Sequence, residues 1–518
     1  MDINGKSFRA FADREEALKR QYDAGRASKQ HVKGKLAAWE RIDLLFDSGT
    51  FEEIDAYNTP SAVEVEFGKV EKSYGDGVIV GHGKVNGRLI FAYAQDFTVM
   101  GGSLGIVHAK KIAKIQDMAL KMGAPIIGLM DSGGARIQEG IASLSGYATI
   151  FHNIISSSGI IPQISVIMGP AAGGAVYSPA LTDFVFMTSL TSYMFVTGPN
   201  VVKEVLNEDV TSEELGGAEI HARKSGVAQM IYDDEENTIL ALKKFLAYLP
   251  SNNLENAPVT ADDGSIPDFN PKLRDIVPDD PNKAYDVRDV IANIVDRNSF
   301  FESAELFAGN LVTGFARLAG KTIGVVANQP KVLAGVLDID SSVKGARFIR
   351  FCDAFNIPIL TLEDVPGFLP GVNQEHAGII RHGAKMLFAY SEATVPKITV
   401  ILRKAYGGAY IVMNSKNLGG DFNFAWPTAE IAVMGPDGAV AILYRKELAA
   451  SDNPAAMKKE LLKRYREKVA NPFIADEQGY VDEVIDPAIT RRKIISAFEA
   501  LGNKWVKAPA RKHGNMPL

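Results

Sequence analysis

Two glycine pairs stand where the backbone itself could do chemistry. The first is Gly173-Gly174 in GPAAGGAVYSP, and the second is Gly407-Gly408, followed by Ala409, in RKAYGGAYIVM. Each pair follows an apolar run typical of a strand and precedes an expected helix, so consecutive N–H groups can approach a ligand closely. Such donors stabilise an anion that develops on a carbonyl oxygen, as when a thioester becomes an enolate.

The alternative explanation of each pair is tight packing of a strand against a helix. Recurrence of the pair at equivalent places in both halves of the chain favours anion binding. Other glycine loops are ambiguous by themselves: DSGGARIQEG from Asp131, DVPGFLPG from Asp364 and GGSLG from Gly101. An Asp or Ser here could cap a helix. No Walker-A lysine follows, and no GxGxxG opens a βαβ unit, which disfavours a nucleotide site.

Few of the reactive side chains form a recognisable catalytic or metal-binding motif. The eight histidines have no metal-ligand spacing, so we expect no metal site, and no GxSxG motif is present. Cys352, the one cysteine, lies in an apparently amphipathic helix and is expected in the core. No carboxylates form an evident acid–base pair. The inventory therefore suits a reaction whose base comes from a cofactor.

The elements that position these loops are predicted by apolar runs alternating with amphipathic helices. The expected strands are RLIFAYAQD, PIIGLMD and QISVIMG in the first half, and KTIGVVANQ, PILTLED and KITVILR in the second. Such runs predict parallel sheets covered on both faces. The pairs Gly101 and Gly335, Gly133 and Gly367, and Gly174 and Gly408 share one spacing, which indicates an internal duplication.

The chain of 518 residues is long enough for several domains. A Pro-, Asn- and Asp-rich stretch at about 249–283 predicts a linker, so we expect domains at 1–255 and 256–518. The segment at about 13–45 is predicted to be helical.

The overall charge and hydropathy limit the partners. A net charge of -6 with no basic block disfavours nucleic acid. No signal peptide and no run of about 18 apolar residues is found. We therefore expect a cytoplasmic protein that does not insert into a membrane, although its partner could be membrane-bound.

Together the motifs resemble a known family. DSGGARIQEG, GPAAGGAVYSP, DVPGFLPG, RKAYGGAYIVMNSK and FAWPTAEIAVMG closely resemble the carboxyltransferase (β) subunits of biotin-dependent acyl-CoA carboxylases. The nearest resemblance is to the propionyl-CoA carboxylase β subunit and the methylmalonyl-CoA decarboxylase α subunit. It runs from about Gly34 to the C-terminal RKHGNMPL. It implies an α/β fold of two tandem crotonase-like domains (ββα superhelices), usually assembled as a hexamer.

The resemblance also implies roles for the glycine loops. Gly173 and Gly174 would hold the acyl-CoA thioester oxygen. Gly408 and Ala409 would hold the ureido oxygen of biotin, and Gly407 would also lie at the biotin site. The 1–255 domain would be the acyl-CoA side and the 256–518 domain the biotin side. Biotin would supply the base, which agrees with the lack of an evident protein base.

Further contacts to acyl-CoA are implied for two other regions. Gly133, Gly134 and Ala135 would lie at the acyl-CoA, and Lys344 and Arg347 are candidates for its phosphates, although helix charges are more often solvated. Ile411 would face the acyl group, where several propionyl-type relatives have Asp, so a broader or longer acyl range is compatible. The alternative is that Ile411 continues an apolar helix face.

Biotin would arrive on a separate carrier protein, because the chain has no Met-Lys-Met biotinylation signal, and a biotin carboxylase would load it. The expected function is carboxyl transfer between carboxybiotin and the α-carbon of a short-chain acyl-CoA such as propionyl-CoA, giving methylmalonyl-CoA. One alternative is the transferase of a sodium-pumping methylmalonyl-CoA decarboxylase, which runs the reverse reaction. A crotonase-type hydratase or isomerase is disfavoured by the duplication and by the absence of a catalytic Glu pair.

Overall fold

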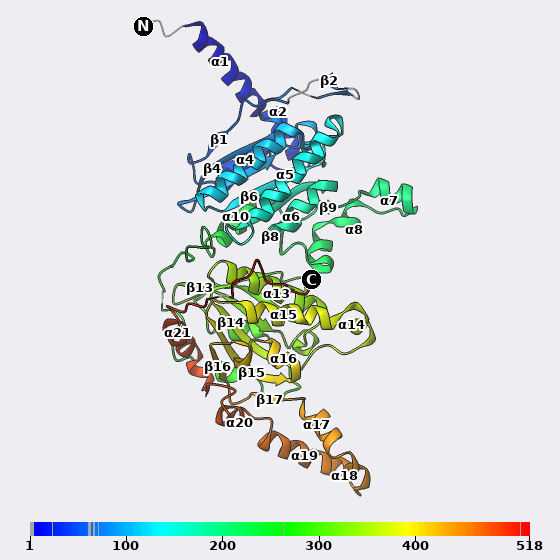
Figure 1. Ribbon diagram of the computed structural model, residues 1–518, viewed down its shortest axis with the longest axis vertical. Coiled ribbons are helices and arrows are strands. Elements are labelled where there is room, and N and C mark those ends of the chain that lie inside the picture. The colour runs from blue at the N-terminus through cyan, green and yellow to red at the C-terminus, as the bar shows by residue number, and fades with distance from the viewer. Residues whose placement is uncertain are drawn as a thin grey trace. The chain divides into compact units, whose positions relative to one another are not determined.

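The computed structural model describes residues 5–22, 24–60, 64–65, 68–70, 72–262, 264–507 and 509–518. The chain divides into two compact units, Met1–Glu255 and Asn256–Leu518 (Figure 1). Each unit is an α/β structure built around one sheet, with the strands running in the same spatial order.

The sheet of the first unit has the order β1-β4-β5-β6-β7-β8-β10, with β9 paired to the end of β7. Its strands are β1 (Glu52–Ile54), β4 (Val78–Val85), β5 (Arg88–Gln95), β6 (Ile126–Ser132), β7 (Gln163–Ala172), β8 (Phe184–Thr188), β9 (Tyr193–Phe195) and β10 (Met230–Tyr232). β2 (Glu64–Val65) and β3 (Gly68–Lys69) form a separate ribbon. β4 is antiparallel to both neighbours, and the other pairs are parallel. The prediction of a parallel sheet is therefore wrong at this edge.

The α-helices of the first unit are α1 (Lys6–Lys19), α2 (Ala24–His31), α3 (Ala38–Leu45), α4 (Ile106–Met122), α5 (Ile141–Ser157), α6 (Tyr177–Leu181), α7 (Pro199–Leu206), α8 (Ser212–Gly216), α9 (Ala218–Ile220) and α10 (Glu235–Leu246). The helical prediction for 13–45 is wrong in its continuity. α1, α2 and α3 are separate, and Gly34, between α2 and α3, has a φ of 72°. That backbone cannot belong to a right-handed helix.

The second unit repeats the arrangement with the order β11-β12-β13-β14-β15-β16-β18, and β17 pairs with the end of β15. Its strands are β11 (Phe301–Ser303), β12 (Leu311–Leu318), β13 (Lys321–Asn328), β14 (Ile359–Val365), β15 (Lys397–Tyr406), β16 (Phe422–Ala425), β17 (Glu430–Ala432) and β18 (Glu483–Val484). β12 is antiparallel to its neighbours, as β4 is in the first unit. This matching topology confirms the predicted duplication.

The α-helices of the second unit are α11 (Leu273–Ile276), α12 (Val287–Ala292), α13 (Ile339–Ala354), α14 (Val372–Ala377), α15 (Ile379–Glu392), α16 (Gly407–Val412), α17 (Pro436–Leu443), α18 (Arg445–Ala450), α19 (Pro454–Lys468), α20 (Pro472–Glu477) and α21 (Thr490–Ala500). One face of the sheet packs against α12 and α21 through a cluster that includes Val290, Val325, Leu362 and Ile494. The other face meets α13 and α15, because side chains alternate along each strand.

The register of the duplication differs from the predicted one. Gly102, and not Gly101, corresponds to Gly335, because each lies against the carbonyl of the equivalent aspartate. Likewise the amides of Leu104 and Leu337 donate to the carbonyls of Gly134 and Gly367, so the spacing there is one residue shorter than predicted. Gly174 and Gly408 do correspond. The connection between β6 and β7 is one residue shorter than that between β14 and β15, which accounts for the difference.

Candidate functional site

The first glycine pair lies where β7 leaves the main sheet. The register between β6 and β7 shifts after Met130, and beyond the shift the segment Pro170–Ala172 pairs with β9 instead of β8. Gly173 then adopts a φ of 61°, which turns the chain into the short helical segment leading to α6. Only glycine adopts this backbone at little cost, so the sequence fixes the turn at this residue.

The second glycine pair repeats this geometry in the other unit. The register of β14 and β15 shifts after Glu363, and Lys404–Tyr406 pairs with β17. Gly407 has a φ of 60° and begins α16. The N–H groups in the first turn of a helix lack partners within that helix. Gly408 and Ala409 therefore present their amides at the start of α16, as the oxyanion hypothesis requires.

The space beside the two pairs differs. A side chain added at Gly174 would meet the ring of Tyr147 at 3.2 Å, whereas one added at Gly408 would meet no atom within 4 Å. Gly408 is also exposed. The turn at the start of α16 therefore faces open space in its own unit, into which an anionic group could be brought.

A buried network of ion pairs stabilises the segment that leads into the first glycine pair. The Asp131 carboxylate, at the end of β6, pairs with Lys35 at 2.5 Å and Arg41 at 3.0 Å, and Arg41 also pairs with Glu235 at 2.7 Å. Gly169 runs directly against Asp131, so a methyl group there would collide with the carboxylate. Burial lowers the pKa of Lys35 although Asp131 opposes the shift. The network ties the segment before α3 to the strand that leads into Gly173.

Asp364 has the corresponding role in the second unit. Its carboxylate accepts hydrogen bonds from the Arg403 side chain at 3.0 Å and from the Lys404 amide at 3.0 Å. The Arg403 guanidinium also lies over the Tyr285 ring. Burial raises the pKa of Asp364, and Arg403 opposes that shift. Here the cation comes from β15 itself, so the two loops are braced by equivalent acids but by cations from different elements.

Sequence reasoning did not identify these two aspartates as supports, although a signal was present. In both halves an Asp ends the apolar run that precedes a glycine loop, as in LMDSGG and LEDVPG. The partners could not be found in the same way, because Arg41 and Arg403 stand at unrelated positions in the two copies. The sequence therefore allowed the acids to be predicted but not the network.

The amides of Gly133 and Gly134 already have acceptors inside the unit. Gly133 donates to the Gly101 carbonyl at 2.9 Å, and Gly134 donates to the Ser132 hydroxyl at 3.1 Å. The first bond joins the loop to the segment before α4, and the second lies within the loop. The acyl-CoA contact expected at Gly133, Gly134 and Ala135 stays a prediction. Neither of these two bonds involves the Ala135 amide.

Lys344 does not fit the predicted contact with a CoA phosphate. Its side chain is buried, and its Nζ donates to the carbonyls of Ala304 at 2.8 Å and Phe307 at 2.7 Å. Burial lowers its pKa to about 7. Lys111 is its counterpart in α4, with Nζ donating to the carbonyls of Gly75 and Val78 and a pKa lowered by burial to about 8. The two lysines therefore fasten equivalent loops, which is a structural role.

Arg347 and Ile411 are both exposed. Arg347 lies on α13 three residues after Lys344, so it stays a candidate for a phosphate contact. Ile411 lies on α16 and is 47% exposed. An apolar side chain that merely continued a core face would be covered, so the exposure favours the predicted role at the acyl group. Cys352, by contrast, is buried in α13, as predicted.

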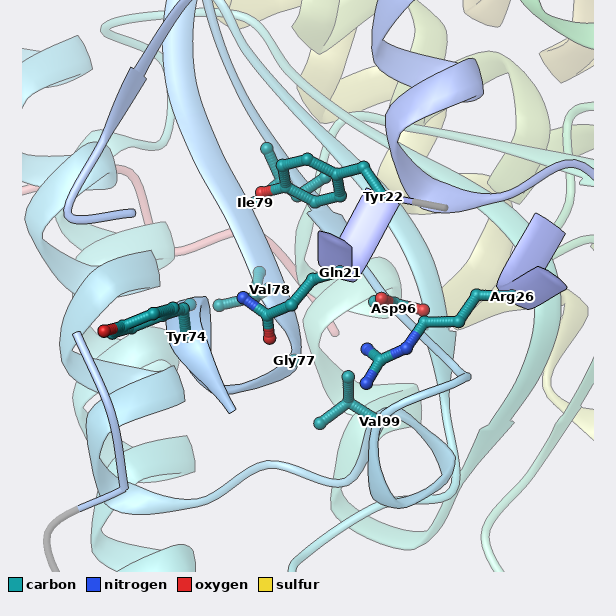
Figure 2. A pocket seen from close by; sticks show the side chains of 10 residues that line it. Gln21, Tyr22, Arg26, Tyr74, Gly77, Val78, Ile79, Asp96 and Val99 are labelled. Atoms are coloured by element: carbon teal, nitrogen blue, oxygen red, sulfur yellow. The ribbon is translucent and has the colours of Figure 1, made fainter. Parts of the chain in front are cut away.

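A small pocket lies at the N-terminal helices of the first unit, away from the glycine pairs in the sequence. Figure 2 shows the side chains that surround it; its lining consists of Gln21, Tyr22, Arg26, Tyr74, Gly75, Gly77, Val78, Ile79, Asp96 and Val99. None of these is a predicted site residue. Within the described ranges no group of three or more acidic, His or Cys side chains could hold a metal, and no helix there could span a membrane.

Comparisons with known proteins agree with this geometry. The family model described as the carboxyl transferase domain matches residues 29–516. The carboxyltransferase subunit of propionyl-CoA carboxylase from Haloferax mediterranei is 57% identical over 506 residues, covering 98% of both chains. The methylmalonyl-CoA decarboxylase α subunit of Propionigenium modestum is 52% identical over 518 residues, covering 100% of both.

A comparison with solved structures supports the same family. The transcarboxylase 12S structure, described as a hexamer assembly with methylmalonyl-CoA and methylmalonic acid bound, superposes with a TM-score of 0.95 at 50% identity, covering 98% of both chains. The expected crotonase-like fold in two domains is thereby confirmed. With braced Gly-Gly turns in both units and a family match over nearly its whole length, the chain belongs to the carboxyl transferase family and is a biotin-dependent carboxyltransferase.

Proposed function

We propose that this chain transfers a carboxyl group between carboxybiotin on a carrier protein and the α-carbon of a short-chain acyl-CoA, with propionyl-CoA and methylmalonyl-CoA as the substrate pair. The observation that carries the proposal is the repeated turn at Gly173 and Gly407, which presents backbone donors in each unit. Two separate anions need stabilisation in such a reaction, one on the thioester oxygen and one on the ureido oxygen. Among the relatives named above, one is a propionyl-CoA carboxylase subunit, and transcarboxylase 12S has methylmalonyl-CoA bound.

The residues of this chain bind and orient the reactants. The amides at Gly173 and Gly174 hold the thioester oxygen and stabilise the enolate that forms when the α-proton leaves. The amides at Gly408 and Ala409 hold the ureido oxygen, and the open space beside Gly408 admits the ring. Biotin, when bound, supplies the carboxyl group and the base. Asp131 and Asp364 keep the two turns in place.

The assembly and the partners are also part of the proposal, and the comparison with transcarboxylase 12S supports the hexamer. We expect a homohexamer, as in transcarboxylase 12S, with biotin delivered by a separate carrier protein that a biotin carboxylase loads. A cytoplasmic location is also a prediction, which cell fractionation tests. Pull-down from the native host should recover the carrier and the carboxylase.

A second candidate is decarboxylation as the physiological direction, which the similarity to the Propionigenium modestum subunit favours. The same site would then remove the carboxyl group from methylmalonyl-CoA, and a membrane partner would use the energy released. The identity of the co-purifying partner distinguishes the two: a biotin carboxylase for the carboxylase, a polytopic membrane subunit for the decarboxylase.

The function is tested without partners by supplying free biotin and methylmalonyl-CoA to the purified oligomer. We expect release of propionyl-CoA that depends on biotin. Hydration of an enoyl-CoA in the absence of biotin would instead support a hydratase. If a correctly assembled oligomer turned over neither methylmalonyl-CoA nor malonyl-CoA, the proposal would be wrong.

Ile411 should affect the choice of acyl group. Replacing it with aspartate introduces a charge where an exposed apolar side chain now stands, and contact with a longer acyl chain then becomes unfavourable. We expect kcat/KM for longer acyl-CoA esters to fall by about tenfold or more relative to propionyl-CoA, since one or two methylene contacts are worth about 1–3 kcal/mol. An unchanged preference would place Ile411 outside the acyl site. Leu254→Asp, at an exposed apolar residue outside both glycine turns, controls for lost solubility.

A further inference from the structure

Glu363 is a carboxyl group in an unusual environment. It lies on β14, its side chain is fully buried, and neither carboxyl oxygen has a hydrogen-bond partner among the residues that the structure describes. Buried polar groups are nearly always paired, because an unpaired one costs several kcal/mol. An ionised carboxylate would cost far more, so the acid is expected to be neutral.

The sheet geometry places Glu363 beneath α16. Thr361, two residues earlier on the same face of β14, shares a hydrogen bond of 2.8 Å with Tyr390 of α15. In the parallel register Glu363 is opposite Ile401, and Ile401 belongs to a core cluster against which Tyr410 of α16 packs. Glu363 therefore lies one layer below the helix that presents Gly408 and Ala409.

The fold does not require an acid at this position. The equivalent residue of the first unit is Met130, since both residues immediately precede the register shift of their strand. Met130 is also buried. A chemically inert side chain thus fills the same place in the other copy, so the carboxyl group is specific to the second unit.

Among the residues that the structure describes, no cation is placed to offset a charge on Glu363. Burial raises its pKa well above the ordinary value, and Asp364 raises it further. On the helices packed over this face, burial raises the pKa of Tyr390 and Tyr410, and Glu363 raises both further. Burial also raises the pKa of Cys352 on α13. Lys344, the buried cation of α13, donates instead to the carbonyls of Ala304 and Phe307. Lys397, at the start of β15, donates instead to the Tyr390 carbonyl. The surroundings therefore keep Glu363 neutral at ordinary pH but provide nothing to balance the anion.

We propose that Glu363 is a positioning residue whose neutral state maintains the anion site at Gly408 and Ala409, and whose ionisation sets the alkaline limit of carboxyl transfer. A negative charge beneath α16 opposes the negative charge that develops on the ureido oxygen. Hydration of the carboxylate would also loosen the packing of α16 against β14. The inference rests on the proposed role of Gly408 and Ala409.

The test compares the wild type with Glu363→Gln and Glu363→Met, using free biotin and methylmalonyl-CoA from neutral to alkaline pH. Glutamine keeps the shape without the charge, and methionine copies Met130. Glu499→Gln is the control, because Glu499 is an exposed acid on α21, which packs on the opposite face of the sheet. We expect equal rates at neutral pH. At alkaline pH the two neutral variants should be about tenfold faster than the wild type and the control.

A second measurement needs no substrate, so it separates this inference from the proposed function. A folded-state pKa above the ordinary glutamate value of about 4.3 gives stability that is present at low pH and lost as pH rises through the folded pKa. The unfolding midpoint of Glu363→Gln should therefore exceed that of the wild type by an increasing margin as pH rises. The proposal is overturned if the turnover of all four proteins falls in the same way at alkaline pH. It is also overturned if the difference in unfolding midpoint between Glu363→Gln and the wild type does not change with pH. Absence of any biotin-dependent rate at neutral pH would instead refute the proposed function.

Discussion

Replacing Gly408 with valine is expected to lower biotin-dependent turnover by about 10²- to 10³-fold, as much as the loss of one oxyanion donor. A Cβ added at Gly408 meets no atom of its own unit within 4 Å outside its own helix and chain neighbours, and Gly408 does not have a positive φ. The unit should therefore fold normally. The valine would instead occupy the space that the proposed ureido ring needs, which moves the reacting oxygen away from the amides.

Substitutions at the other glycines of the two turns would not separate loss of ligand binding from damage to the fold. Gly173 and Gly407 have positive φ, so any substitution strains the backbone whether or not a ligand binds. At Gly174 a new side chain would contact the Tyr147 ring. Gly5→Val is the matched control for Gly408→Val, because its side chain also enters open space but lies at the start of α1.

The measurement is the rate of propionyl-CoA release with free biotin, alongside the thermal unfolding of each variant. Wild-type turnover by a stable Gly408→Val oligomer would remove Gly408 from the biotin site. Lower turnover together with a lower unfolding midpoint would indicate damage to the fold, and Gly408→Ala then serves as the milder variant.

Three strands of each half were predictable because the information is local. Runs such as QISVIMG and KITVILR are almost wholly apolar, which only a strand buried on both faces requires, and they match β7 and β15. The antiparallel edge was missed, although Asn86-Gly87 between β4 and β5, with a positive φ at both residues, is the typical sequence of a two-residue hairpin turn. Apolar content does not reveal strand direction.

The positions of long side chains were less predictable. Lys344 could be placed on a helix, but whether its ammonium faces solvent or three backbone carbonyls depends on the loop before β12, which is distant in sequence. The pairing of Gly101 with Gly335 failed for a related reason. A repeated glycine marks a turn, yet a one-residue difference in a connecting segment is invisible until contacts identify the true partners.

The network around Arg41 leads to the second prediction, which concerns stability. Replacing Arg41 with methionine is expected to lower the free energy of unfolding by about 3–5 kcal/mol, the usual cost of removing one partner from a buried ion pair. Arg41 is 1% exposed and bonds to Glu235 through two nitrogens at 2.7 Å. Methionine fills a similar volume, so the loss would come from the two acids and not from a cavity.

Of these two acids, Glu235 would lose more of its hydrogen-bond and ion-pair partners than Asp131. Asp131 keeps its pair with Lys35, whereas Glu235 keeps only the weaker hydrogen bond from the Leu36 amide at 3.2 Å. A double variant, Arg41→Met with Glu235→Gln, should therefore recover part of the lost stability, because the uncompensated charge is removed. Urea denaturation of all three proteins, followed by a probe in the first unit, measures the difference.

Arg20→Met is the control, since Arg20 pairs with Glu16 on the exposed surface of α1 and such pairs contribute about 0–1 kcal/mol. Equal midpoints for Arg41→Met and Arg20→Met would show that the buried network does not stabilise the first unit. If Arg41→Met is destabilised but keeps full turnover, the network supports the fold without setting the Gly173 turn. We expect the stability and the turnover of Arg41→Met to fall together, because Asp131 lies against the strand that leads directly into that turn.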